Sequence, residues 1–152
     1  MRKAVFPGSF DPITLGHVDI IRRCIPLFDE IVIGIGVNAD KKYMFPIEER
    51  KRFIEESFIG DDSVSVEIYE GLTVEFCRRI DAQYIIRGLR NAVDFEYEKT
   101  IAHANDKLAG IETVNIFTSP ETSFISSTVV RDVIRNNGDY HKLVPETVKI
   151  TK

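Results

Sequence analysis

The sequence of 152 residues has few cysteines, no long apolar run and no excess of positive charge. Its two cysteines, Cys24 and Cys77, lie far apart in apolar helical patterns, which is typical of buried, reduced thiols rather than a disulfide framework. No apolar stretch approaches about 18 residues and no signal-peptide core precedes the first strand-like segment, so we expect a cytoplasmic protein without a membrane partner. The net charge of −4 excludes a global basic field that would recruit nucleic acid.

Several signatures of familiar chemistry are absent as well. The sequence contains neither the G-x-G-x-x-G dinucleotide fingerprint nor the G-x-x-x-x-G-K-[ST] phosphate loop. It has no set of cysteines and histidines at zinc spacing, no nucleophile elbow, and no carboxylate pair arranged as acid and base. These absences favour catalysis by positioning and charge stabilisation over covalent catalysis or proton abstraction.

Strand-like and helix-like patterns alternate along the whole chain. Strands are predicted at residues 2–6, 30–37, 64–69, 83–86 and 113–117, and helices at 17–28, 46–58, 73–80, 91–109 and from about 126. Length and ordinary globular composition fit a single domain over residues 1–152. Five short strands with intervening helices predict an α/β fold, with a parallel sheet covered by helices on both faces.

The most informative segment is residues 7–17, Pro-Gly-Ser-Phe-Asp-Pro-Ile-Thr-Leu-Gly-His, between the first strand and the first helix. A loop rich in glycine and proline brings backbone N–H groups close to an anion, and the helix N-terminus adds partial positive charge. A histidine at this point, His17, is placed to donate to developing negative charge, although such a histidine is more often a cap or a surface residue. The segment predicts a phosphate site.

The other strand-end loops carry similar groups, and in a parallel sheet these loops meet at one edge. In chain order they offer Ser9 and His17, then Lys41 and Lys42, then Gly71 and Thr73, then Arg87, Gly88 and Arg90, and finally Ser123, Ser126, Ser127 and Thr128. Each alone has an ordinary interpretation as a helix cap, a solvated turn or a surface ion pair. Together they predict a polyanion site for a nucleoside triphosphate and a second phosphate.

The predicted helix over 91–109 carries two distinct rows of side chains. One row is apolar and comprises Val93, Tyr97, Ile101, Ala104 and Leu108. Asp94, Glu98 and Asn105 share another face, which is either a solvated surface or a polar lining of the same pocket. Four phenylalanines, at positions 10, 45, 95 and 124, are interpreted as core or loop anchors rather than as platforms for a base.

Two segments resemble the paired signatures of the HIGH nucleotidyltransferase superfamily: residues 7–17, and residues 125–131 with the sequence Ile-Ser-Ser-Thr-Val-Val-Arg. Within it, the chain resembles the bacterial phosphopantetheine adenylyltransferase family from residue 2 to about 147. The segments that carry this likeness are Ile-Ile-Arg-Gly-Leu-Arg at 85–90, Asp-Phe-Glu-Tyr-Glu at 94–98, and Lys41-Lys42 before Met44-Phe45. The resemblance implies a Rossmann-like nucleotidyltransferase fold.

That family transfers AMP from ATP to 4′-phosphopantetheine with Mg²⁺, forming dephospho-coenzyme A and pyrophosphate in coenzyme A biosynthesis. The resemblance further implies a homohexamer and feedback inhibition by coenzyme A. Two alternatives stay open: another small-molecule acceptor, such as nicotinamide mononucleotide or glycerol 3-phosphate, or a nucleotide-binding regulatory protein without turnover.

The resemblance also implies roles for individual residues. Catalytic roles fall to His17, Lys41 and Arg90, and contacts with 4′-phosphopantetheine to Ser9, Lys41, Thr73, Arg87 and Asn105. Contacts with ATP fall to Ser9, Phe10, His17, Gly88, Leu89, Arg90, Glu98, Thr122, Ser123, Phe124, Ile125, Ser126, Ser127 and Thr128. No protein ligand for a metal is implied. Thr14 stands where the wider superfamily has histidine, and either Lys41 or Lys42 could face the substrate.

Overall fold

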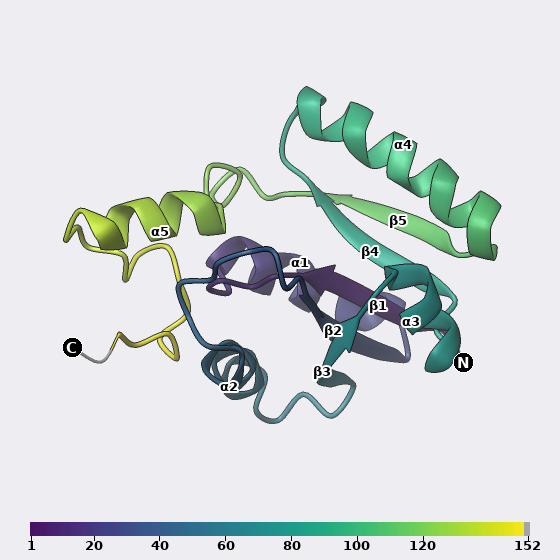
Figure 1. Ribbon diagram of the computed structural model, residues 1–152, viewed down its shortest axis with the longest axis horizontal. Helices are drawn as coiled ribbons and strands as arrows, with labels where there is room; N and C mark the ends of the chain where they lie inside the picture. Colours follow the sequence, from purple (N-terminus) through teal and green to yellow (C-terminus); the bar gives the residue numbers. More distant parts are fainter. Residues whose placement is uncertain (151–152) are drawn as a thin grey trace.

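The computed structural model describes residues 1–150, which form a parallel sheet with flanking helices (Figure 1). In chain order the elements are β1 (Lys3–Gly8), α1 (Leu15–Cys24), a 3₁₀ turn (Ile25–Leu27), β2 (Glu30–Val37), α2 (Ile47–Ser57), β3 (Val64–Glu70), α3 (Thr73–Arg79), β4 (Tyr84–Leu89), α4 (Ala92–Ala109), β5 (Glu112–Phe117) and α5 (Ser127–Arg135). No helix within residues 1–150 is long and apolar enough to cross a membrane.

All neighbouring strands are parallel, in the order β3-β2-β1-β4-β5. The chain builds outward from β1 to β3, then returns to the other side of β1 with β4 and β5. This reversal places a topological switch point between β1 and β4, where the crossover connections leave on opposite sides and open a crevice. The predicted five-stranded parallel sheet is therefore confirmed.

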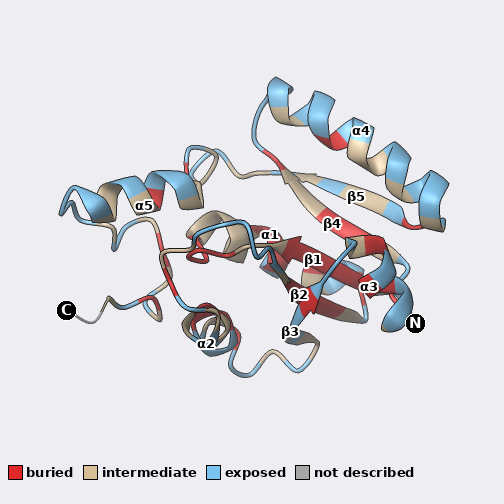
Figure 2. Cartoon of the chain, viewed as in Figure 1, coloured by how far each residue is buried: buried red, intermediate tan, exposed pale blue. Residues whose placement is uncertain are grey.

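Alternating side chains of the central strands divide the core into two layers. Ala4 and Phe6 of β1 point to the side covered by α1, α2 and α5, whereas Val5 points to the side covered by α3. This period of two follows from the pleat of a strand, and strands apolar on both faces require helices on both faces. Figure 2 shows the buried residues gathered on β1, β2 and β4. Cys24 and Cys77 are buried free thiols, one in each layer, as predicted.

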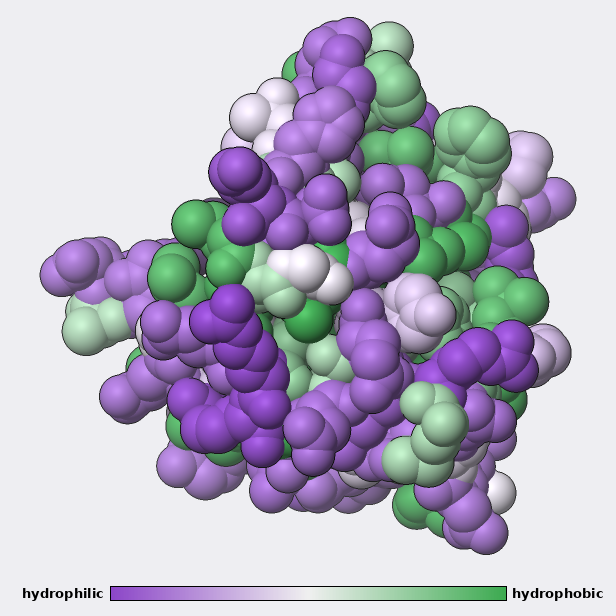
Figure 3. All heavy atoms as spheres, turned by 90° about the vertical axis from the view of Figure 1, so that its right-hand side faces the viewer, coloured by the Kyte–Doolittle hydropathy of each residue, from purple (hydrophilic) through white to green (hydrophobic). Residues whose placement is uncertain are grey.

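Helix α4 departs from the orientation that its apolar row suggests. Val93, Tyr97 and Leu108 are 80%, 64% and 62% exposed, whereas Glu98 is the residue of this helix that is buried. The polar row therefore faces the sheet, where Glu98 and Asn105 find polar partners on β4 and β5. Figure 3 shows hydrophobic residues exposed on the upper part of one face, at the height of α4 in Figure 1.

The strands next to the switch point are longer than their apolar runs predict. Strand β1 continues to Gly8 and β4 continues to Leu89, so Arg87 and Gly88 lie within a strand rather than in the loop that follows it. The reason is that sheet hydrogen bonding continues past the apolar residues, as β4 and β5 stay in register through Leu89 and Phe117. Helix α1 begins at Leu15, two residues before the predicted start.

Candidate functional site

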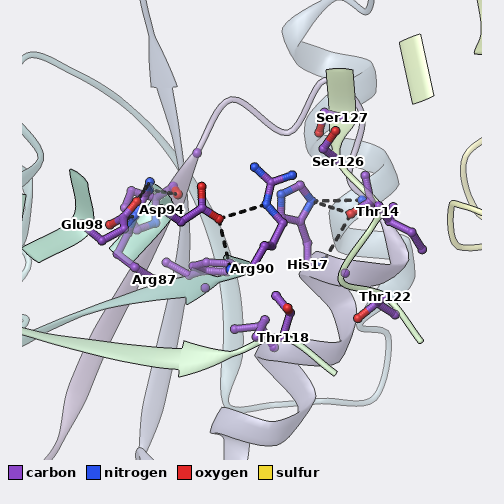
Figure 4. A pocket seen from close by; sticks show the side chains of 17 residues that line it. Thr14, His17, Arg87, Arg90, Asp94, Glu98, Thr118, Thr122, Ser126 and Ser127 are labelled. Carbon is purple, nitrogen blue, oxygen red and sulfur yellow. Dashed lines mark hydrogen bonds and ion pairs between the residues drawn. The ribbon is translucent and has the colours of Figure 1, made fainter. Parts of the chain in front are cut away.

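A cleft of about 290 Å³ opens beyond the carboxyl ends of β1 and β4, at the switch point (Figure 4). Its lining comprises Phe6, Pro7, Gly8, Thr14, Gly16, His17, Ile20, Arg87, Gly88, Arg90, Asp94, Glu98, Thr118, Thr122, Ile125, Ser126 and Ser127. Nine of these are residues that the sequence assigned to substrates: His17, Arg87, Gly88, Arg90, Glu98, Thr122, Ile125, Ser126 and Ser127. Segments that are more than 100 residues apart in the sequence thus meet in one cleft.

His17 is held in one orientation by the cap of α1. The Thr14 backbone N–H donates to Nδ1 of His17 at 3.0 Å, and the Thr14 hydroxyl accepts from the His17 backbone N–H at 3.3 Å. This is a capping box in which histidine takes the place of the usual glutamate or glutamine. Because Nδ1 accepts a hydrogen bond, the proton of the neutral ring is assigned to Nε2, which remains a donor.

The surroundings of His17 also keep its ring neutral. Burial, reinforced by the positive charges of Arg87 and Arg90, lowers the pKa of His17 from 6.5 to about 4. The Phe10 ring packs edge-on against the imidazole, with centroids 4.9 Å apart, and Phe6 lies at 6.1 Å. His17 is therefore a neutral hydrogen-bond donor at physiological pH, and no proton has to leave before it can act.

Two arginines of the cleft are oriented by carboxylates on α4. Arg87 makes a two-pronged ion pair with Glu98, at 3.0 Å and 2.8 Å, and also donates to the Pro7 carbonyl at 3.3 Å. Burial by itself would lower the pKa of Arg87, but the Glu98 carboxylate outweighs it and raises the pKa. Arg90 lies in the more open part, with its Nε 3.3 Å from Asp94. Figure 4 shows Arg90 beside His17.

Two helix N-termini contribute to the cleft, as the sequence predicts. Thr14 and Gly16 line it at the start of α1, and Ser126 and Ser127 at the start of α5. The Ser126 hydroxyl caps α5 by accepting from the Val129 N–H at 3.2 Å, while the Leu15 N–H at the start of α1 donates to Leu143. Backbone N–H groups and the helix dipole at such ends favour an anion.

Other residues that the sequence assigned to the second substrate lie beyond the lining of the cleft. Lys41 lies on the loop after β2, and its Nζ is 3.4 Å from the Ser9 hydroxyl. Thr73 shares a hydrogen bond of 2.8 Å with the Tyr69 hydroxyl, and Asn105 donates to Thr113 at 3.3 Å. Ser9 and Lys41 are thus brought together across 32 residues of sequence, whereas Thr73 and Asn105 already have partners within the chain.

The residues assigned to ATP divide between the cleft and its neighbourhood. Leu89 and Ser123 line an adjoining hollow that shares Arg90 and Thr118 with the cleft. Phe10 is 2% exposed and packs behind His17, which confirms its interpretation as an anchor, and Phe45 is 6% exposed. Phe95 and Phe124 are 49% and 64% exposed, so they are not core residues. Thr128 is exposed and accepts from Arg131 at 3.2 Å.

The structure also brings in residues for which the sequence indicates no role. Thr14 positions His17, and its place three residues before His17 was the available signal for a capping box. Asp11 is 3% exposed and binds the backbone of the loop that carries Lys41. Thr118, which lines the cleft from the segment after β5, had no signal in the sequence.

The cleft offers little to a metal ion by itself. No group of three or more His, Cys, Asp or Glu side chains within residues 1–150 is arranged to hold one. The two carboxylates of the lining, Asp94 and Glu98, are each paired with an arginine. Mg²⁺ commonly takes one or two carboxylates plus phosphate oxygens. Because arginines already engage both carboxylates, the lining fits an ion that is held mainly by the phosphates of a nucleotide.

Comparison with known proteins places the chain in a family. Residues 5–133 match the Cytidylyltransferase-like family model. The phosphopantetheine adenylyltransferase of Flavobacterium psychrophilum is 65% identical over 150 residues, with 99% of both chains covered. The enzyme of that name from Bacteroides fragilis is 47% identical, over 99% of this chain and 100% of its own.

A likeness among solved structures extends to more distant proteins. The bifunctional NMN adenylyltransferase/ADP ribose pyrophosphatase of Francisella tularensis matches with a TM-score of 0.73 and 16% identity, over 94% of this chain and 44% of its own. The chain thus spans less than half of that neighbour, and the likeness shows a shared fold. With the match to the family model and the identity over its whole length, the chain belongs to the phosphopantetheine adenylyltransferase family.

Proposed function

We propose that the cleft transfers AMP from ATP to 4′-phosphopantetheine, as the names of the relatives describe. An oxygen of the acceptor phosphate forms a bond to the α-phosphorus of ATP, and the bond from that phosphorus to the bridging oxygen of the β-phosphate breaks. The products are dephospho-coenzyme A and pyrophosphate. The observation that carries the proposal is identity to phosphopantetheine adenylyltransferases over nearly all of both chains.

The acceptor needs no general base in this reaction. A phosphate monoester has a second pKa near 6, so it is already dianionic at neutral pH. The task of the site is to bring two mutually repelling polyanions together and to stabilise the charge that develops between them. We assign Lys41 and Ser9 to the acceptor phosphate, since their side chains lie together at 3.4 Å. Arg87, Thr73 and Asn105 complete the proposed acceptor side.

His17 is the proposed donor to the α-phosphate in the transition state. Its neutral ring keeps a proton on Nε2 while Thr14 holds Nδ1, so the donor is oriented before the substrate binds. Arg90 and the start of α5 are assigned to the leaving pyrophosphate, because both supply positive potential at the open side of the cleft. The remaining residues that the resemblance assigns to ATP are Phe10, Gly88, Leu89, Glu98, Thr122, Ser123, Phe124, Ile125, Ser126, Ser127 and Thr128.

Magnesium is proposed to bind through the phosphates of ATP. When bound, it would neutralise part of the charge on those phosphates. The carboxylates of Asp94 and Glu98 stay with their arginines and continue to orient them.

We also propose a homohexamer, feedback inhibition by coenzyme A and a cytoplasmic location. An exposed apolar row on α4 supports assembly, because Val93, Tyr97 and Leu108 would leave water at a subunit contact. Coenzyme A carries the pantetheine arm of the acceptor, so occupation of the acceptor side would explain inhibition.

The decisive experiment measures pyrophosphate release from ATP and Mg²⁺ with three acceptors in parallel: 4′-phosphopantetheine, nicotinamide mononucleotide and glycerol 3-phosphate. Turnover with 4′-phosphopantetheine alone is expected. Turnover with another acceptor would preserve the ATP half of the site and overturn the second substrate. ATP binding without turnover on any of them would favour a regulatory protein.

A further inference from the structure

Two buried charged residues lie next to the cleft and are not among the residues assigned to ATP or to the acceptor. Asp11 and Arg50 are each 3% exposed, and the lining of the cleft, within the described residues, includes neither side chain. Burying a charge is unfavourable unless it is paired and hydrogen-bonded. Their partners therefore indicate what these charges do for the fold.

The Asp11 carboxylate binds the loop that follows β2. Its two oxygens accept from the backbone N–H groups of Met44, at 2.8 Å, and Phe45, at 2.9 Å. Arg131 lies 4.0 Å away and supplies the opposite charge. Asp11 itself belongs to the loop after β1, so its side chain bridges the two loops that carry Ser9 and Lys41.

Arg50, on α2, also binds both of these loops. Its Nη1 donates to the Ser9 carbonyl at 2.8 Å, and its Nε donates to the Phe45 carbonyl at 3.0 Å. Its guanidinium also lies 4.0 Å from the centroid of the Tyr43 ring, and Lys41 lies over the same ring at 5.7 Å. Both buried charges thus act on the backbone on either side of the contact between Lys41 and Ser9.

A second set of contacts holds the loop after β1 against α5. Arg131 donates to the Asp11 carbonyl at 2.9 Å, and the Ser127 hydroxyl donates to the Pro12 carbonyl at 2.8 Å. These acceptors are backbone atoms, so a substitution of the Asp11 side chain leaves them in place. The ATP side and the acceptor side therefore depend on different atoms of the same loop.

We infer that Asp11 is a positioning residue. Together with Arg50 it holds the loop of Lys41 beside Ser9, so that Lys41 and Ser9 can both bind the phosphate of the acceptor. The inference rests on the proposed function for the identity of that acceptor. Misplacement of a substrate-positioning group by about 1 Å can cost on the order of 100-fold in rate. A hydrogen-bonded bridge between two backbones is a direct means of preventing such a shift.

The test uses the full chain with Asp11→Asn, which keeps the shape of the side chain and turns one acceptor oxygen into a donor facing a backbone N–H. Amide hydrogen exchange should speed up at Met44 and Phe45. The KM for 4′-phosphopantetheine should rise by roughly 10- to 100-fold. The KM for ATP should stay within about twofold, because the hydrogen bonds to α5 are to the Asp11 and Pro12 carbonyls and the Asp11 carboxylate makes only the 4.0 Å ion pair with Arg131.

Two controls separate positioning from a loss of stability. Val148→Ala, at a core position that is 1% exposed, supplies a destabilised variant whose two KM values should both stay as in the wild type. In the double variant Asp11→Asn/Lys41→Ala, the KM for 4′-phosphopantetheine should match that of Lys41→Ala alone, because Asp11 acts through Lys41.

Specific outcomes would overturn the inference. These are unchanged exchange at Met44 and Phe45, equal rises in both KM values, or fully additive effects of Asp11→Asn and Lys41→Ala. If Asp11→Asn fails to fold, Arg50→Lys decides by the same measurements, since lysine cannot reach both carbonyls. A wild-type chain that is inactive with 4′-phosphopantetheine would refute the proposed function, and hydrogen exchange would still show whether Asp11 holds the loop.

Discussion

The backbone N–H of Thr14 donates to Nδ1 of His17 at 3.0 Å, so a helix cap selects the tautomer of a histidine in the cleft. The same pair of residues therefore does two things. It satisfies donors at the start of α1, and it leaves Nε2 of His17 as a donor toward the cleft.

We predict that His17→Ala lowers kcat by roughly 100- to 1,000-fold, the cost of losing one preoriented donor in a transition state. The KM values should change little, because the contact forms mainly as charge develops. Steady-state pyrophosphate release measures both parameters, and circular dichroism verifies the fold. A kcat close to the wild-type value in a folded variant would remove His17 from the mechanism.

The lowered pKa of His17 makes a prediction for stability against pH. Its pKa is about 4 in the folded chain and 6.5 in the unfolded one, so between these values the unfolded state binds more protons. Stability should therefore be lost as pH falls from about 6.5 to about 4. Urea unfolding across this range should show a shallower fall for His17→Gln than for the wild type. Equal slopes for the two proteins would contradict a neutral His17 in the folded chain.

The two arginine–carboxylate pairs should respond differently to loss of the negative charge. Glu98 is 6% exposed, and Glu98→Gln takes away the charged acceptor of Arg87. We expect this variant to lose roughly 2 kcal/mol in the free energy of unfolding. Asp94→Asn takes away the charged partner of Arg90. Because Arg90 is exposed, this variant should lose less than about 1 kcal/mol in the free energy of unfolding. Denaturant titration of both variants tests the ranking, which would fail if Asp94→Asn were the more destabilising.

Assembly through α4 is the fourth prediction. Val93→Glu places a charge in the exposed apolar row and should dissociate the proposed homohexamer, because a buried unpaired carboxylate opposes a subunit contact. Ile59→Glu, at a position that is 81% exposed outside α4, is the matched control and should leave the assembly unchanged. Sedimentation velocity distinguishes the two results. A monomeric wild-type chain would refute the hexamer itself.

The sequence determined the sheet and the general place of the site. Apolar runs such as residues 31–35 are hydrophobic on both faces, which is what a covered parallel strand requires. Because ligands bind beyond the carboxyl ends of parallel strands, the same pattern predicts a site at residues 7–17 and 85–90. Both segments line the cleft. Both features follow from local residue patterns, which the amino-acid sequence carries directly.

Only the tertiary structure decided which side chains meet and which way α4 faces. Sequence periodicity shows that Val93 and Glu98 lie on different faces of a helix, but the partner of each face depends on β4, whose Arg87 pairs with Glu98. In the same way, the contact of Lys41 with Ser9 arises because Asp11 and Arg50 join two loops through backbone atoms. A hydrogen bond from a side chain to the backbone of a distant residue does not depend on the type of that residue. The sequence pattern therefore does not predict these contacts, and only the folded chain brings the atoms together.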